Sequence, residues 1–70
     1  MNQKKECNDF IQFINKSVKI IDKKYYTEYI KELKIITNNF IKDTKLSNEN
    51  INYINIEINK LNEIMCNERF

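Results

Sequence analysis

Apolar residues recur with a helical period in the last third of the chain. The spacings are 3, 4, 3 and 4, which places one side chain per turn on a single stripe of a helix. The stripe consists of Ile51, Ile54, Ile58, Leu61 and Met65. Before it, Ser47 can cap the first turn, Glu49 suits the positive end of the helix dipole, and Leu46 can pack back onto the stripe. The pattern predicts a helix near 48–67.

The first third of the chain repeats this arrangement with spacings of 4, 3, 4, 3 and 4. Its apolar positions are Cys7, Ile11, Ile14, Val18, Ile21 and Tyr25, with Phe10 and Phe13 beside them. Four lysines occupy the opposite face: Lys5, Lys16, Lys19 and Lys23. An apolar face opposed to a basic one predicts an amphipathic helix near 4–22. Such a helix could also lie on a membrane surface, but the other apolar stripes are available to cover it, so we expect it to pack within the protein.

A third apolar face lies between these two segments and predicts a helix near 26–43. It comprises Tyr26, Tyr29, Ile30, Leu33, Ile36, Phe40 and Ile41. Residues 42–45 (Lys-Asp-Thr-Lys) form the turn that we expect before Ser47. A turn near 22–27 has weaker signals, because only Asp22 or Thr27 could cap a helix there, and the whole chain has no glycine or proline to interrupt it.

Two all-α architectures are compatible with these stripes. One is a small bundle of three helices near 4–22, 26–43 and 48–67, with residues 1–70 forming a single domain. The other is a long helix near 4–43 folded against the short last helix. The second would leave half of the apolar stripe of its long helix uncovered and would require a partner or dimerisation into a four-helix bundle. We expect the three-helix bundle, because helices of globular proteins typically run about 8–20 residues.

Composition indicates the origin of the chain more clearly than its function. Ile, Asn and Lys supply 13, 12 and 11 of the 70 residues, as AT-rich codons would produce, so we expect the gene of a low-GC bacterium, a phage or a large DNA virus. Residues 1–45 carry ten lysines and six acidic residues, whereas residues 46–70 carry two basic and four acidic residues. This asymmetry is too modest to predict nucleic-acid binding. Polar residues interrupt every apolar run, so we expect no signal peptide, no membrane partner and a cytoplasmic location, in the host if the gene is viral.

The chain offers little to catalysis or to cofactors. It has no histidine, so neither a serine nor a cysteine nucleophile has its usual base, and its carboxylates are scattered beside lysines. Cys7 and Cys66 fit no zinc spacing and fall at opposite poles of an up-down-up bundle, so we expect two free thiols. We therefore predict no enzymatic activity, no cofactor and no metal site.

Two groups of residues could meet a partner. Asparagines recur at spacings of 4, 3, 4 and 3 beside the last apolar stripe, although asparagine is a poor residue inside a helix. This row, the asparagine strip, consists of Asn48, Asn52, Asn55, Asn59 and Asn62. It reflects either codon bias on a solvated face or a set of hydrogen-bonding groups that borders a binding groove. Among the aromatic residues, Tyr25 and Tyr26 cannot both point inward, and we expect Tyr25, Phe13 and Tyr53 at the surface as possible contacts.

Residues 30–64 also resemble the short helical hairpins of sporulation-type aspartyl-phosphate phosphatases. That family carries a Ser-Gln-Glu-Leu-Asp motif on its second helix, which aligns here with Asn-Ile-Glu-Ile-Asn at 55–59. Glu57 is the identical residue, and Asn59 replaces the central aspartate of the motif. The resemblance implies a diverged relative that acts on response regulators, with its phosphatase activity put in doubt by Asn59.

These observations favour a small non-catalytic binding protein that inhibits or adapts a larger protein by laying a helix face against it. The partner would be another protein, a second copy of the chain, or both. A self-assembling structural module and the diverged phosphatase relative are the alternatives.

Overall fold

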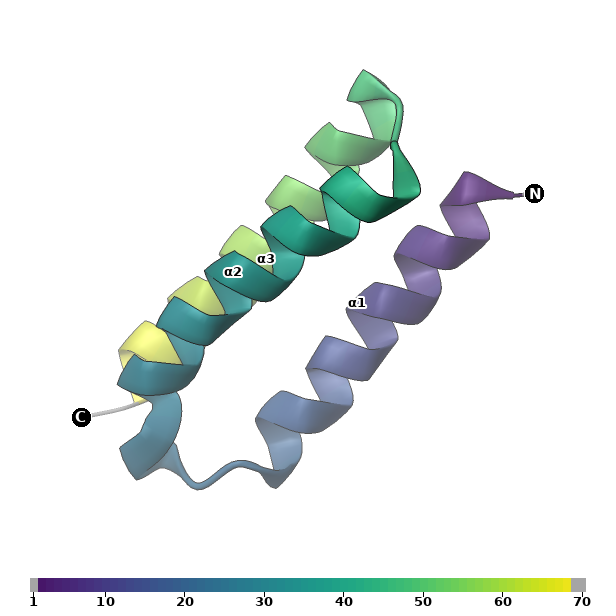
Figure 1. Cartoon of the computed structure of the whole chain (residues 1–70). Coiled ribbons are helices and arrows are strands. Elements are labelled where there is room, and N and C mark those ends of the chain that lie inside the picture. Colours follow the sequence, from purple (N-terminus) through teal and green to yellow (C-terminus); the bar gives the residue numbers. More distant parts are fainter. Residues whose placement is uncertain (1, 69–70) are drawn as a thin grey trace.

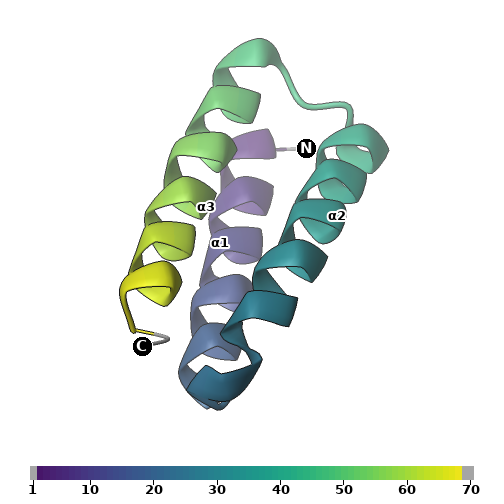
Figure 2. The same cartoon turned by 90° about the vertical axis from the view of Figure 1, so that its left-hand side faces the viewer.

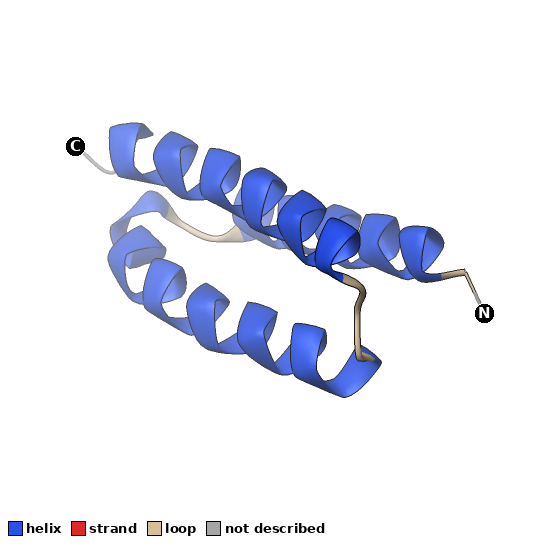
Figure 3. Ribbon diagram, turned by 90° about the horizontal axis from the view of Figure 1, so that it is seen from above, coloured by secondary structure: helices blue, strands red, loops and turns tan. Residues whose placement is uncertain are grey.

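The computed structural model describes residues 2–68, and its regular elements are all helical (Figure 1). Three α-helices follow one another, α1 (Gln3–Ile20), α2 (Tyr26–Thr44) and α3 (Asn48–Glu68), and one turn of 3-10 helix, η1 (Lys23–Tyr25), precedes α2. No strand occurs among these residues (Figure 3). The helices lie side by side in a molecule that measures 39 × 17 × 16 Å. The predicted three-helix bundle is therefore confirmed.

The alternative of one continuous helix near 4–43 is wrong. The backbone is extended at Ile21 and Asp22, where ψ is 136° and 139°. Asp22 then caps η1, because its side chain accepts a hydrogen bond from the Lys24 N–H at 3.2 Å. Thr27, the other candidate cap, lies inside α2. The chain reverses at this turn, so α1 and α2 run in opposite directions (Figure 1).

The turn between α2 and α3 begins later than predicted. Residues 42–45 were expected to form it, but α2 continues through Thr44, whose hydroxyl donates to the carbonyl one turn earlier at 2.6 Å. Lys45 then ends the helix in the left-handed conformation, with φ 52° and ψ 51°. Ser47 caps α3 as predicted, and its Oγ accepts a hydrogen bond from the Asn50 N–H at 3.4 Å.

The start of α1 is tied to this turn by the Gln3 side chain. Its Oε1 accepts hydrogen bonds from the Ser47 N–H at 3.2 Å and from Asn50 Nδ2 at 2.9 Å. Its Nε2 donates to the Lys45 carbonyl at 3.4 Å. One side chain thus satisfies polar groups on both sides of the turn, which fixes the start of α1 against α3.

The core contains most of the predicted stripes. Its members are buried side chains from all three helices together with Leu46 of the turn: Cys7, Ile11, Ile14, Val18, Tyr26, Leu33, Leu46, Ile54, Ile58, Leu61 and Met65. α3 lies close to both other helices, whereas α1 and α2 approach each other closely at fewer places. α3 is therefore the central packing partner of the bundle.

One predicted core position is wrong. Ile36 was assigned to the apolar face of α2, but its side chain is 37% exposed, while the neighbouring Thr37 is 4% exposed. The buried line of α2 runs through Tyr26, Leu33 and Thr37. The cause is geometric, since the apolar arc of α2 is wide and its outer edge turns toward α1, where the helices stand further apart.

Both cysteines are free thiols, as predicted. Cys7 is buried near the beginning of α1, and Cys66 is half-buried near the end of α3. The start of α1 and the end of α3 lie at opposite ends of the bundle (Figure 2), which keeps the two sulfur atoms apart.

Candidate interaction surfaces

Seven apolar side chains lie along the outer side of the α1–α2 pair. We call this surface the α1–α2 face, and it consists of Phe10, Phe13, Ile21, Tyr25, Tyr29, Ile36 and Phe40. Phe13, Tyr25 and Ile36 are 62%, 51% and 37% exposed. The other four are partly buried and pack against the edge of the core. Phe10 and Phe13 are three residues apart on α1, and Ile36 and Phe40 are four apart on α2, so each pair lies on one side of its helix.

A stacked aromatic pair joins the two helices within this face. The rings of Phe10 and Phe40 lie 4.2 Å apart between centroids and are inclined by 9°. Phe13 lies one turn after Phe10 on α1, and Ile36 lies one turn before Phe40 on α2. Because the two helices are antiparallel, Phe13 and Ile36 lie at the same level of the bundle. Phe13 and Ile36, each one turn from this pair, remain open to solvent.

The adjacent tyrosines divide as the sequence predicted. Tyr26 is 4% exposed, and its hydroxyl donates to the Val18 carbonyl at 3.4 Å. Tyr25 is exposed, and the Lys24 ammonium lies 5.1 Å from the centroid of its ring. Tyr26 therefore holds the start of α2 against α1, while Tyr25 is presented at the surface.

Tyr53 does not lie free at the surface, contrary to expectation. Its side chain is half-buried between α3 and α1, and its hydroxyl donates to Asn8 Oδ1 at 2.7 Å. The Lys4 ammonium lies 3.8 Å from the centroid of the ring. Both the polar tip and one ring face are thus engaged within the molecule, so Tyr53 contributes to the α1–α3 contact.

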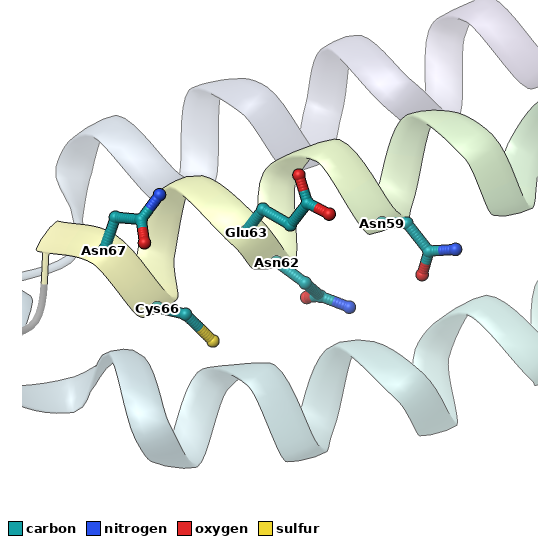
Figure 4. Close-up of a pocket in the computed structure, with 5 residues that line it drawn as sticks. All are labelled: Asn59, Asn62, Glu63, Cys66 and Asn67. Atoms are coloured by element: carbon teal, nitrogen blue, oxygen red, sulfur yellow. The ribbon is translucent and has the colours of Figure 1, made fainter.

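The asparagine strip follows the groove between α2 and α3. Asn48, Asn52, Asn55 and Asn59 are exposed and Asn62 is half-buried. Three of the strip residues, Asn55, Asn59 and Asn62, line a hollow of about 290 Å³ together with Thr37 and other residues of α2. Toward the end of α3 a second hollow, of about 400 Å³, adds Cys66, and Figure 4 shows the side chains of Asn59, Asn62 and Cys66 directed toward α2.

The structure does not unite the two groups of predicted contact residues. Phe13 and Tyr25 belong to the α1–α2 face, whereas the asparagine strip faces α2 from its other side. Tyr29 and Ile36 also contribute to the α1–α2 face, although the sequence pattern assigned both to the interior. Their spacing to Phe40 was visible in the sequence, but the side of α2 that remains open depends on the arrangement of the helices.

Metal ligands, the Cys7 thiol and the length of the apolar segments are the remaining features of the described residues. Within residues 2–68, no group of three or more His, Cys, Asp or Glu residues could hold a metal ion. Burial raises the pKa of the Cys7 thiol, which makes it a poor nucleophile; the Lys4 charge opposes this rise, and Glu6 adds to it. In the same part of the chain, no helix combines the length and apolarity that a membrane crossing requires.

The two residues aligned with the phosphatase motif face different neighbours. Asn59 lines the groove toward α2. Glu57 is half-buried, and its carboxylate pairs with the Lys60 ammonium at 3.5 Å. Two positions apart on a helix, they point in nearly opposite directions, so they do not act on one substrate atom together.

No family model, curated protein or solved structure matches this chain. The resemblance to the phosphatases therefore depends on the motif residues named above.

Proposed function

We propose that this protein is a small, non-catalytic helical module that binds a larger protein through the α1–α2 face and acts as its inhibitor or adaptor. The observation that carries the proposal is the exposure of Phe13, Tyr25 and Ile36 along the α1–α2 pair. Contiguous apolar surface of this kind marks interaction sites in soluble proteins, and aromatic residues dominate the affinity of such sites.

The shape of the face favours a helical partner segment. α3 fills the groove on one side of the α1–α2 pair, and the α1–α2 face forms the opposite side of the same pair. An amphipathic helix laid there would make a four-helix arrangement, with its apolar residues over Phe13 and Ile36. This mode requires no rearrangement of the bundle.

The test compares two double variants in affinity capture from cells that naturally express the gene. Phe13→Gln/Ile36→Gln removes apolar side chains from the α1–α2 face. Ile35→Gln/Ile56→Gln removes two isoleucines that are 56% and 55% exposed elsewhere on the surface. We expect the wild-type protein and the second variant to retain the same partner, and the first variant to lose it.

Circular dichroism of both variants checks that the fold is kept. Equal capture by both variants would show that the α1–α2 face is not the binding surface. Failure of the wild-type protein to retain any specific partner would refute the proposed function itself.

A further inference from the structure

The α1–α2 face ends in a hollow at the turn between α1 and α2. The hollow has a volume of about 420 Å³, and its apolar wall is formed by Ile21, Tyr25 and Tyr29. Its remaining lining residues are all acidic: Asp22, Glu28 and Glu32. We call it the turn hollow. It differs from the rest of the face because carboxylates surround its apolar wall.

The three carboxylates are open to an external cation, although one oxygen of Asp22 also accepts the Lys24 N–H as the cap of η1. All three residues are exposed. The ion pair within residues 2–68 joins Lys60 to Glu57 on α3 and involves none of them. Among residues 2–68 no lysine lines the turn hollow, although Lys23 and Lys24 belong to the neighbouring η1. The local arrangement is therefore complementary to positive charge.

The aromatic wall also suits a cation. The negative face of a tyrosine ring attracts an ammonium or guanidinium group, and in this structure the Lys24 ammonium lies 5.1 Å from the centroid of the Tyr25 ring. Lys24 is exposed on a short turn, so its ammonium can move aside at little cost. An arginine or lysine offers both an apolar stem for Ile21 and Tyr29 and a charged end group for the carboxylates.

We propose that the turn hollow binds a lysine or arginine side chain of the partner, carried by an amphipathic helix whose apolar residues cover the rest of the α1–α2 face. This inference builds on the proposed function and specifies the chemistry of the partner. The bound segment is basic where it meets the turn and apolar along Phe13 and Ile36.

The probe for the turn hollow is propylguanidinium, which reproduces the end of an arginine side chain. Its neutral counterpart of similar shape is propylurea. Each is titrated into the ¹⁵N-labelled full-length protein and followed by amide chemical shifts. We expect propylguanidinium to cause saturable shifts confined to residues 21–32, with affinity on the order of millimolar, and propylurea to cause none.

Two triple variants of equal net charge separate a local effect from a general one. Asp22→Asn/Glu28→Gln/Glu32→Gln neutralises the turn hollow, and asparagine at position 22 retains the capacity to cap η1. Glu49→Gln/Glu63→Gln/Glu68→Gln neutralises three exposed carboxylates of α3. We expect the first variant to weaken propylguanidinium binding by about fivefold or more, and the second by less than about twofold.

Equal affinity for propylurea, unchanged binding by the first variant, or saturable shifts outside residues 21–32 would each overturn the inference. The titration needs no partner, so its outcome is independent of the capture experiment. If capture depends on Phe13 and Ile36 while the first triple variant still retains the partner in full, the module binds its partner without a cation in the turn hollow, and this inference alone fails.

Discussion

Two polar atoms in the α2–α3 contact have no hydrogen-bond partner among the described residues. They are Thr37 Oγ1 and Asn62 Oδ1, and both are shielded from solvent. A buried polar group without a partner destabilises the folded state, because it loses hydrogen bonds to water on folding and gains none in return. The contact between α2 and α3 is therefore less stable than its apolar residues would make it.

Replacing the Thr37 hydroxyl should stabilise the protein. Thr37→Val keeps the shape of the side chain and has a similar helix propensity, so we expect the free energy of unfolding to rise by about 1 kcal/mol. Urea denaturation measures the change. Thr44→Val is the matched control, because the Thr44 hydroxyl donates to the Phe40 carbonyl at 2.6 Å, and its loss should leave stability unchanged or lower it. A decrease for Thr37→Val would show that its hydroxyl finds a partner in solution.

Cys7 and Cys66 should differ in reactivity. Burial raises the pKa of the Cys7 thiol, and the side chain is fully enclosed, whereas Cys66 is half-buried. Because the thiolate is the reactive form, we expect iodoacetamide to modify Cys7 at least about tenfold more slowly than Cys66 in the native protein. Mass spectrometry of the digested protein measures both sites in one sample, and guanidinium-unfolded protein is the control in which the rates converge. Similar native rates would mean that α1 opens frequently.

The raised pKa of Cys7 also has a consequence for stability against pH. The folded state holds the thiol proton more tightly than the unfolded state, so this contribution is complete below the ordinary value of 9.0 and is lost as the pH rises through the higher folded value. Urea denaturation at pH values below and above 9.0 should show that the free energy of unfolding declines with pH in the wild-type protein, and that this decline is shallower in Cys7→Ala. An equal decline in both proteins would assign the effect to other groups.

At the scale of the elements, the two turns differ in how far the sequence could predict them. The turn before α3 was predictable because Ser47 lies directly before a regular apolar stripe. The turn after α1 was not, because Ile21, Tyr25 and Tyr29 keep a 4-residue spacing through it, as they would in an unbroken helix. In the folded protein these three residues meet in the turn hollow instead. The two cases are distinguished by the extended backbone at Ile21 and Asp22 and by the burial of Tyr26, which depend on how α2 packs.

Lys45 offers a test of the turn between α2 and α3. Lys45 adopts the left-handed conformation, with φ 52°. This conformation costs a residue that has a Cβ atom about 1 kcal/mol, because the Cβ atom comes close to the following carbonyl oxygen. We expect Lys45→Gly to raise the free energy of unfolding by about 0.5 kcal/mol, since part of the gain is offset by the greater freedom of glycine in the unfolded chain. Lys42→Gly, within the last turn of α2, should lower it by about 0.5–1 kcal/mol. Thermal unfolding followed by circular dichroism measures both variants, and equal losses would contradict this account of the turn.

At the scale of the whole molecule, the two sides of α2 have different character. The α1–α2 face is apolar and ends among three carboxylates, whereas four of the eight residues that line the α2–α3 hollow are asparagines. The sequence contained both sets of residues, but only the packing of α3 against both other helices places them on separate sides. The exposure of Phe13 and Tyr25 could therefore be predicted from the sequence, but their separation from the asparagine strip could not, because it depends on how the helices pack.

The acidic rim of the turn hollow also bears on self-association, the alternative use of the α1–α2 face. A two-fold dimer uses the same patch on both copies, and pairing the turn hollow with itself would bring Asp22, Glu28 and Glu32 of each copy together. Like charges placed across an interface disfavour it. We therefore expect the protein to be monomeric at micromolar concentration and about 0.15 M salt.

Sedimentation equilibrium measures the mass under these conditions. Asp22→Asn/Glu28→Gln/Glu32→Gln removes the repulsion and leaves Phe13, Tyr25 and Ile36 in place, so this variant should self-associate more strongly than the wild-type protein if the face is adhesive. Glu49→Gln/Glu63→Gln/Glu68→Gln makes the same change in net charge on α3 and should remain as monomeric as the wild type. A wild-type dimer that Phe13→Gln/Ile36→Gln dissociates would instead favour a self-assembling module, because it would show that apolar contacts across the α1–α2 face outweigh the repulsion between the two rims.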